Sequence, residues 1–329
     1  DNLRGLADLE HGGFGGAPKF PHPTTIDRLL RHWRGSAHDP QPDKDGLFFA
    51  ALTLKRMAEG GIYDHLGGGF CRYSVDRFWT IPHFEKMLYD NGQLASIYAE
   101  AHARTGDPYH AEVVRGILDY VAREMTDADG AFWSAQDAEV DAREGGTQIW
   151  TPDEMRSSLV EAGLESEVDF AFALYGLDAG SNFQDPHQPD APPSNVLRLR
   201  ERPEVVAAAM GMDPAAFAAR RAKIDATLLA TREKRPQPAL DDKILASWNG
   251  LMIKGFADGG RVLGESTYVD AANRAADAVL ARLGRADGGL NRTARGDVVQ
   301  IDAFLEDIPL WSGFLIPLLG KLRIRDVHW

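Results

Sequence analysis

Cysteine is nearly absent from the sequence, and its scarcity excludes several kinds of site. Cys71 is the single cysteine among 329 residues. One thiol cannot form an internal disulfide, a CxxC redox pair or a thiolate metal cage, and it favours a reducing compartment. We therefore expect a cytoplasmic protein. HExxH, P-loop and GxGxxG motifs are lacking too, so we expect neither a metal nor another cofactor.

Long apolar runs are missing as well. No stretch of about eighteen apolar residues occurs, so no membrane-spanning helix is expected. Acidic residues outnumber Lys and Arg, and the formal net charge of −13 argues against a nucleic-acid groove. The 44% hydrophobic and 26% charged fractions are those of an ordinary globular protein. Neither a membrane nor a nucleic acid is an expected partner.

Helical spacing of apolar residues dominates the chain, with glycine-rich loops between the helical segments. Pro82 suits a first helical turn and Gly106 suits a helix end, so we expect one long helix between them, over 82–104. Segments 131–133 and 147–150 indicate a small β excursion. The other expected helices are 24–33, 47–59, 109–125, one starting near 151, 167–175, 213–232, 243–263, 267–283 and 304–320.

An internal repeat with an offset of about 158 residues organises these helices. Three pairs of segments match at this offset: Asn91-Gly92 with Asn249-Gly250, Gly106 with Gly264, and Asp129-Gly130 with Asp287-Gly288. Each copy has the pattern of an αα-hairpin, and the beginning of a third hairpin is indicated near residue 304. Stacked hairpins form an open solenoid or a closed ring, and the long inserts favour the ring. We expect an all-α, α/α toroid in one domain over 1–329, incomplete, with small β excursions in its loops.

Four sequence blocks resemble a known family. They span 10–23, 60–73, 81–91 and 240–250, and they are similar to the YyaL-like proteins and spermatogenesis-associated protein 20. The resemblance implies a six-hairpin glycosidase-like fold, close to that of N-acylglucosamine 2-epimerases. Family members usually carry an N-terminal thioredoxin-like domain. We expect this chain to lack that domain, and a separate thioredoxin-like domain is a possible partner.

His83 is the leading candidate for catalysis. It falls in the first turn of the expected helix, where the helix dipole disfavours the protonated ring and leaves a neutral general base. The repeat offset places Asp241 at the equivalent position and sets Glu85 opposite Lys243. The alternative is structural: His83 caps the helix, and Glu85 pairs with Lys86 at the surface.

His65 lies in the glycine-rich loop ahead of Arg72 and Tyr73. Glycines let the backbone approach a ligand closely, and Arg and Tyr side chains donate hydrogen bonds to hydroxyls. His65 is therefore the candidate that returns the proton taken by His83. The alternative is a tight turn whose polar groups bond only to the backbone.

Tryptophans and carboxylates near these loops extend the candidate site. Indole rings stack on the C–H faces of sugars, although tryptophan also fills cores, which is the role we expect of Trp150. Two carboxylates suit glycoside hydrolysis, although Asp at a helix start is usually a cap. The residues assigned to substrate binding are Arg72, Tyr73, Trp79, Glu85, Trp133, Asp137, Trp248, Asn249 and Glu306.

Three functions remain open from the sequence. The first is a sugar isomerase or epimerase, in which His83, His65 and Asp241 carry out proton transfer next to a carbonyl. The second is a glycoside hydrolase that pairs Asp137 or Asp241 with Glu306. The third is a non-catalytic module that serves a thioredoxin-like domain. A small carbohydrate is the expected ligand in the first two.

Overall fold

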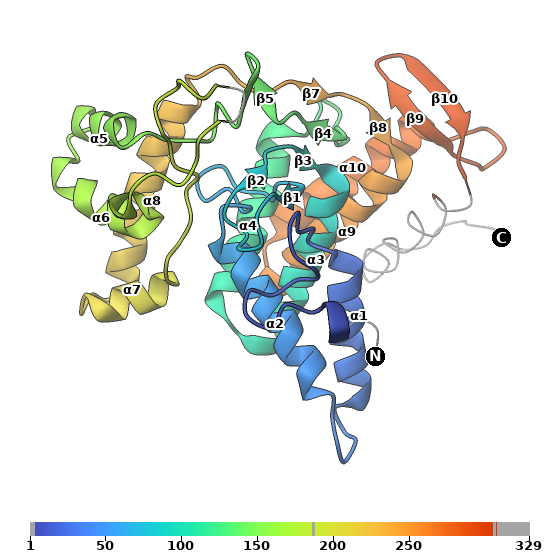
Figure 1. Ribbon diagram of the computed structural model, residues 1–329. Coiled ribbons are helices and arrows are strands. Elements are labelled where there is room, and N and C mark those ends of the chain that lie inside the picture. The colour runs from blue at the N-terminus through green and yellow to red at the C-terminus, as the bar shows by residue number, and fades with distance from the viewer. Residues whose placement is uncertain (1–3, 186–187, 305–306, 308–329) are drawn as a thin grey trace. The chain divides into compact units, whose positions relative to one another are not determined.

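The computed structural model describes residues 4–185, 188–304 and 307. The chain forms two compact units, Asp1–Glu85 with Asp137–Ala239, and Lys86–Gln136 with Leu240–Trp329. Helices are the main element of both units, and short strands interrupt the loops between them (Figure 1). The expected all-α class with small β excursions is confirmed. Within the described ranges, no helix is both long and apolar enough to cross a membrane.

The first unit is built from paired helices and loops. Three of its helices begin at side chains that accept hydrogen bonds from the free backbone amides: Asp43 caps α2, Thr151 and Glu154 form a capping box at α5, and Asp213 caps α8. The helices are α1 (Pro23–Ser36), α2 (Lys44–Glu59), α5 (Pro152–Glu161), α6 (Val168–Tyr175), α7 (Pro203–Ala209) and α8 (Pro214–Arg232). The strands are β1 (Tyr73–Ser74), β2 (Pro82–His83), β5 (Glu139–Val140) and β6 (Arg143–Glu144), and the 3-10 turns are Arg4–Leu6, Glu165–Glu167 and Leu177–Ala179.

The second unit contains the two repeats. Its helices are α3 (Leu88–Thr105), α4 (Pro108–Glu124), α9 (Ala246–Leu263) and α10 (Ser266–Leu283). Its strands are β3 (Lys86–Met87), β4 (Ala135–Gln136), β7 (Leu240–Asp241), β8 (Ile244–Leu245), β9 (Asn291–Arg295) and β10 (Val298–Asp302). They form two sheets, in the orders β3-β4-β7 and β10-β9-β8.

The repeat expected from the sequence holds in the structure of this unit. Adding 158 to the bounds of α3 gives the bounds of α9, and the same offset carries β3 onto β8. Even the strand pairing repeats, because Lys86 pairs with Gln136 as Ile244 pairs with Ala294. Gly106 and Gly264 end the two long helices in the left-handed conformation that favours glycine.

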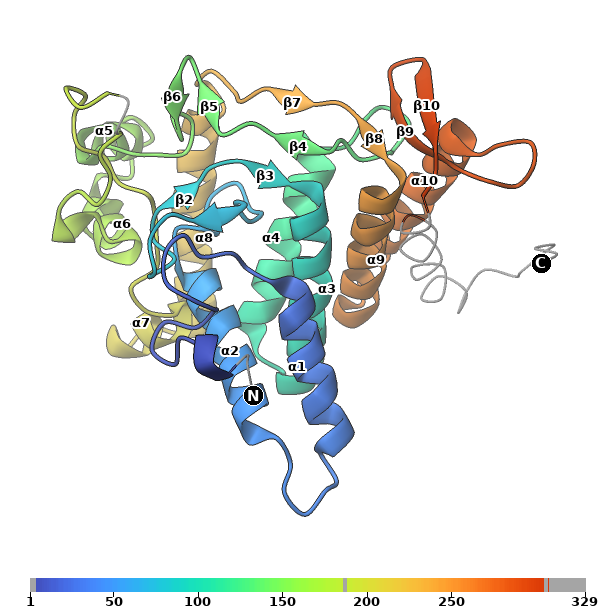
Figure 2. The ribbon, with the colours of Figure 1, turned by 45° about the vertical axis from the view of Figure 1, so that its right-hand side comes forward.

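The helices α3 and α9 lie side by side, and glycines allow their backbones to meet (Figure 2). A Cβ atom on Gly92 would lie 2.7 Å from the backbone nitrogen of Met252, and one on Gly255 would lie 2.8 Å from the Gly92 carbonyl oxygen. Gly92 and Met252 both belong to the early part of their helices, so the two helices start at the same end. The third helix of this repeat, expected over 304–320, falls outside the described residues.

Two expected helix starts are wrong. The helix predicted over 82–104 begins only at Leu88, and the one predicted over 243–263 begins at Ala246. Residues 82–87 are extended instead, because they pair with strands: β2 with β1, and β3 with β4. The hairpin β9–β10 and the helix α7 were not expected from the sequence.

Candidate functional site

His83 lies on the strand β2, opposite Tyr73 of β1. It is therefore not in the first turn of a helix, and the expectation that a helix dipole keeps its ring neutral is wrong. Its surroundings instead come from the loops and short strands of the first unit.

Carboxylates face both nitrogens of the His83 ring. Nδ1 lies 2.7 Å from Oε1 of Glu144, and Nε2 lies 3.9 Å from Oε2 of Glu85. The same Glu85 oxygen accepts a hydrogen bond of 2.8 Å from Arg72. The four side chains are 20–41% exposed, so a ligand in solvent can reach them.

The Tyr73 ring covers one face of the imidazole. The two ring planes are inclined by only 21°, and their centroids are 5.0 Å apart. Stacking and the bond to Glu144 together fix the orientation of the His83 ring. The sequence-predicted residues His83, Arg72, Tyr73 and Glu85 therefore lie together.

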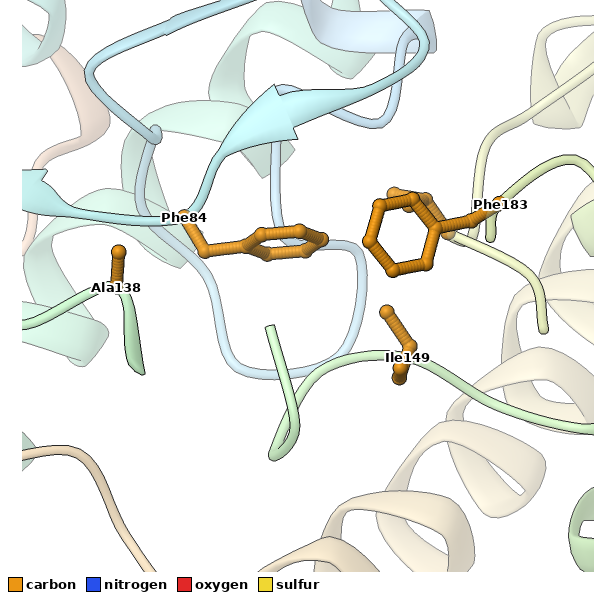
Figure 3. Packing of buried hydrophobic residues seen from close by; sticks show 5 residues of the cluster. Phe84, Ala138, Ile149 and Phe183 are labelled. Carbon is orange, nitrogen blue, oxygen red and sulfur yellow. The ribbon is translucent and has the colours of Figure 1, made fainter. Parts of the chain in front are cut away.

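An apolar cluster anchors the segment that carries His83 and Glu85. Phe84 stands between them in sequence, and its ring is 2% exposed and packs edge to face against Phe183 (Figure 3). Ile149 and Ala138 belong to the same cluster. Because side chains alternate along an extended segment, burial of Phe84 directs its two neighbours to the other side.

The Phe84 ring also contacts the segment that supplies Glu144. Gly145 has a φ of +68°, and a Cβ atom there would lie 2.5 Å from the ring. Only glycine fits this position. The close approach holds the strand β6, and with it the carboxylate of Glu144, next to His83.

This arrangement is suited to proton transfer. An ionised carboxylate only accepts hydrogen bonds, so Nδ1 of His83 donates to Glu144. When the ring is neutral, the lone pair is then on Nε2, which can act as a base. A carboxylate that fixes the tautomer of a histidine in this way is a recurring device in general base catalysis.

His65 is buried in the glycine-rich loop. Its Nε2 lies 2.9 Å from the carbonyl oxygen of Gly60, and burial, with the nearby Arg221 charge adding, lowers its pKa to about 4. These contacts favour the structural alternative for His65 over the role of proton donor to a substrate.

Two residues assigned to substrate binding are core residues, and the assignment is wrong for both. Trp79 is completely buried, and its indole N–H donates to the carbonyl of His11. Asn249 is also completely buried, and its amide bonds to the backbone of Phe132 and Leu245. Trp150 is completely buried, which confirms its expected core role.

The remaining carboxylate candidates are engaged locally or not described. Asp137 accepts a hydrogen bond from the amide of Ala138. Burial would raise the pKa of Asp241, but hydrogen bonds and charge from Lys243, with a bond from Ser134, hold it below its usual range. Glu306 falls outside the described residues.

Besides the buried Asn249, three described residues of the predicted site belong to the second unit: Asp241, Trp133 and Trp248. Trp248 and Trp133 are half-buried, and Trp248 packs edge to face on Tyr89 with centroids 4.8 Å apart. They form no part of the group around His83 within the first unit. Their assignment to substrate binding stays a prediction.

The sequence reading missed Glu144. It lies 61 residues from His83, in an exposed hairpin rich in charged residues. The only local signal is Gly145-Gly146 directly after it, which marks a backbone position that requires glycine.

Comparison with known proteins gives the family. No protein-family model matches the chain. Human spermatogenesis-associated protein 20 is 39% identical over 282 residues, 82% of this chain, and the rat protein is 39% identical over 322 residues, 91% of this chain. The chain belongs to the spermatogenesis-associated protein 20 family. It spans 36% of the human and 41% of the rat protein of this family.

Two solved structures similar to this family member are of carbohydrate enzymes. A sugar epimerase from a ruminal bacterium is 12% identical, with 99% of this chain and 96% of that one covered and a TM-score of 0.35. An α-1,6-mannanase of Salegentibacter in complex with α-1,6-mannotriose is 12% identical, with 93% and 59% covered and a TM-score of 0.48. These neighbours are six-hairpin α/α toroids, the class expected from the sequence. At such scores the likeness carries no argument about activity.

Proposed function

We propose that the first unit binds a carbohydrate and that His83 transfers a proton at the carbon next to its carbonyl group, as a sugar isomerase or epimerase. The single observation that carries this proposal is the bond of 2.7 Å between Nδ1 of His83 and Glu144. It leaves Nε2 as a fixed base on a partly exposed ring. The carbohydrate class rests on the sequence resemblance to N-acylglucosamine 2-epimerases and on the hydroxyl-binding groups beside the ring.

The proton transfer needs a base and a nearby cation, and the site has a residue for each role. Nε2 of His83 takes the proton from the carbon, while the C–H electron pair moves to the carbonyl oxygen and forms an enediolate. Arg72 is the nearby cation that offsets this negative charge. Isomerisation follows when His83 returns the proton to the former carbonyl carbon and the proton of the neighbouring hydroxyl moves to the former carbonyl oxygen. Epimerisation follows when the first carbon instead takes a proton from solvent on its opposite face and the carbonyl group forms again.

Solvent exchange tests the proposal. The chain is incubated in D2O with glucose, mannose, N-acetylglucosamine and cellobiose, and NMR follows loss of the proton signal next to the anomeric carbon. We expect His83→Asn to lower the exchange rate on the order of a hundredfold to ten-thousandfold. His38→Asn, at an exposed position of the same unit, serves as the control and should exchange normally.

The opposite result would refute the proposal: exchange at full rate in His83→Asn, or none in the wild-type protein. A parallel assay of reducing ends with mannobiose and cellobiose distinguishes hydrolysis. Release of reducing ends without exchange would favour the glycoside hydrolase. A partnership with a thioredoxin-like domain stays a prediction, as does a single domain over 1–329.

A further inference from the structure

One face of a small sheet in the first unit carries three rings in a row. The segment at Lys19 pairs with Ser74, and β1 pairs with β2, so three extended segments lie side by side. The ring centroids are 4.8 Å apart between Phe20 and Tyr73, and 5.0 Å apart between Tyr73 and His83. The row therefore runs from Phe20 to the ring proposed as the base.

The opposite face of this sheet is buried and holds Phe20 in place. Lys19 has no exposed surface, and two backbone bonds of 2.7 and 2.8 Å join it to Ser74. Its ammonium group donates to three oxygens, those of Asp8, Gly12 and Arg77. Because neighbouring side chains point to opposite faces, burial of Lys19 turns Phe20 outward. The 39% exposure of Phe20 thus results from a fixed backbone.

A second apolar side chain widens this surface. Val75 follows β1 and is 47% exposed, and its amide donates to the carbonyl of Ile81. Its position two residues after Tyr73 puts it on the same face. Phe20, Tyr73 and Val75 thus form an apolar strip, which we call the aromatic strip, ending at His83 with its polar neighbours Arg72 and Glu85.

We propose that the aromatic strip binds a second sugar ring, so that the ligand of the His83 site is a disaccharide or a longer saccharide. This inference rests on the proposed function. The C–H face of a pyranose is apolar and packs well on aromatic side chains, whereas its hydroxyls need donors and acceptors. A single ring at His83 uses Arg72 and Glu85 but leaves Phe20 in water; a linked second ring covers Phe20 and removes its apolar surface from water.

Binding measurements on Phe20→Ala test the strip. Isothermal titration compares cellobiose and mannobiose with glucose and mannose. Wild type should bind the disaccharides more tightly. Phe20→Ala should weaken disaccharide binding about two- to tenfold and leave monosaccharide binding unchanged. Phe48→Ala is the matched control, since Phe48 is 60% exposed on α2 of the same unit. Phe20→Trp should restore the affinity, which separates stacking from misfolding.

The titrations distinguish this inference from the proposed function. Disaccharide binding that depends on Phe20, without deuterium exchange, would support the strip and refute proton transfer. Equal binding of mono- and disaccharides by wild type, unchanged disaccharide binding in Phe20→Ala, or no binding of any of the four sugars would overturn the inference.

Discussion

His83 and Glu144 are joined by a hydrogen bond of 2.7 Å that ties the strand β2 to the hairpin β5–β6. Each residue comes from a different loop region of the first unit, and the Phe84–Gly145 contact next to them holds the two regions together. The orientation of the His83 ring therefore depends on the packing of Phe84 against Gly145, the residues next to His83 and Glu144 in sequence.

Replacing the carboxylate should separate orientation from stability. Glu144→Gln puts an amide opposite Nδ1, which no longer selects the tautomer with the lone pair on Nε2. We expect the exchange rate to fall on the order of a hundredfold to ten-thousandfold. Glu139→Gln, at the exposed position paired with Glu144 in the same hairpin, should keep the wild-type rate. Equal rates in all three proteins would mean that Glu144 does not orient the base.

His65 should make the stability of the protein sensitive to acid. Its pKa is about 4 in the folded protein because the ring is buried, against roughly 6.5 when unfolded. As the pH falls below roughly 6.5, the unfolded chain takes up the proton first, so the free energy of unfolding decreases until about pH 4. Between pH 7 and pH 5 this amounts to about 2 kcal/mol.

Urea titrations at pH 7 and pH 5 measure this effect. His65→Gln should lack the His65 contribution and lose less stability over that interval than wild type. His38→Gln, at an exposed position, should behave like wild type. An identical loss in His65→Gln would show that the ring is not buried in its neutral form.

Lys19 should be essential for folding of the first unit. All three hydrogens of its buried ammonium group have oxygen partners. Lys19→Met removes the ammonium partner of the Asp8 carboxylate, which keeps its ion pair with Arg77 at 3.2 Å, and takes the side-chain donor from the carbonyls of Gly12 and Arg77. We expect a loss of about 3–5 kcal/mol in the free energy of unfolding. Lys223→Met, at an exposed position on α8, should change it by less than about 1 kcal/mol. Urea denaturation checks both, and a similar small effect for Lys19→Met would contradict the burial.

The contact between α3 and α9 should reject any side chain at Gly92. Gly92→Ala places a methyl group 2.7 Å from a backbone atom of Met252, which can move only if the helices separate. We expect a destabilisation of about 1–3 kcal/mol. Gly35→Ala, in α1, meets nothing within 4 Å and should instead stabilise by roughly 0.5–1 kcal/mol. Thermal unfolding measures the melting temperatures of both variants against wild type. An unchanged melting temperature for Gly92→Ala would contradict the close approach of the two helices.

Local pattern was enough to predict the repeat and most helices. Helical spacing, a glycine at the end and an Asp-Gly turn after the second helix are all readable within one hairpin, and the structure repeats them at the same offset. The start of α3 was not readable. Pro82 suits a first helical turn and an edge strand equally well, and pairing with residues 73–74 decides between them.

The candidate site was only partly predictable for a similar reason. Arg72, Tyr73 and Glu85 lie close to His83 in sequence, and the structure brings them together with it. Glu144 reaches His83 from a hairpin 61 residues away, and the glycines that follow it do not indicate which residue it contacts. Trp79 was assigned to substrate binding because the sequence does not show which residue packs against its indole ring. In the structure the ring lies directly against Gly13, where a Cβ atom would be 2.5 Å from it.

The repeat with its offset of 158 residues also separates duplicated structure from divergent chemistry. Asn91 and Asn249 occupy equivalent positions, and each donates to the carbonyl that precedes its helix, Met87 at 2.9 Å and Leu245 at 3.1 Å. His83 and Asp241 occupy equivalent positions too, yet the first carries an imidazole and the second a carboxyl group. The two copies thus share their backbone structure, but the imidazole is present at only one of the two equivalent positions. The substitution His83→Asp would give the first position the residue of the second. It would keep a backbone that already accommodates Asp at the equivalent position and would remove the reactive group.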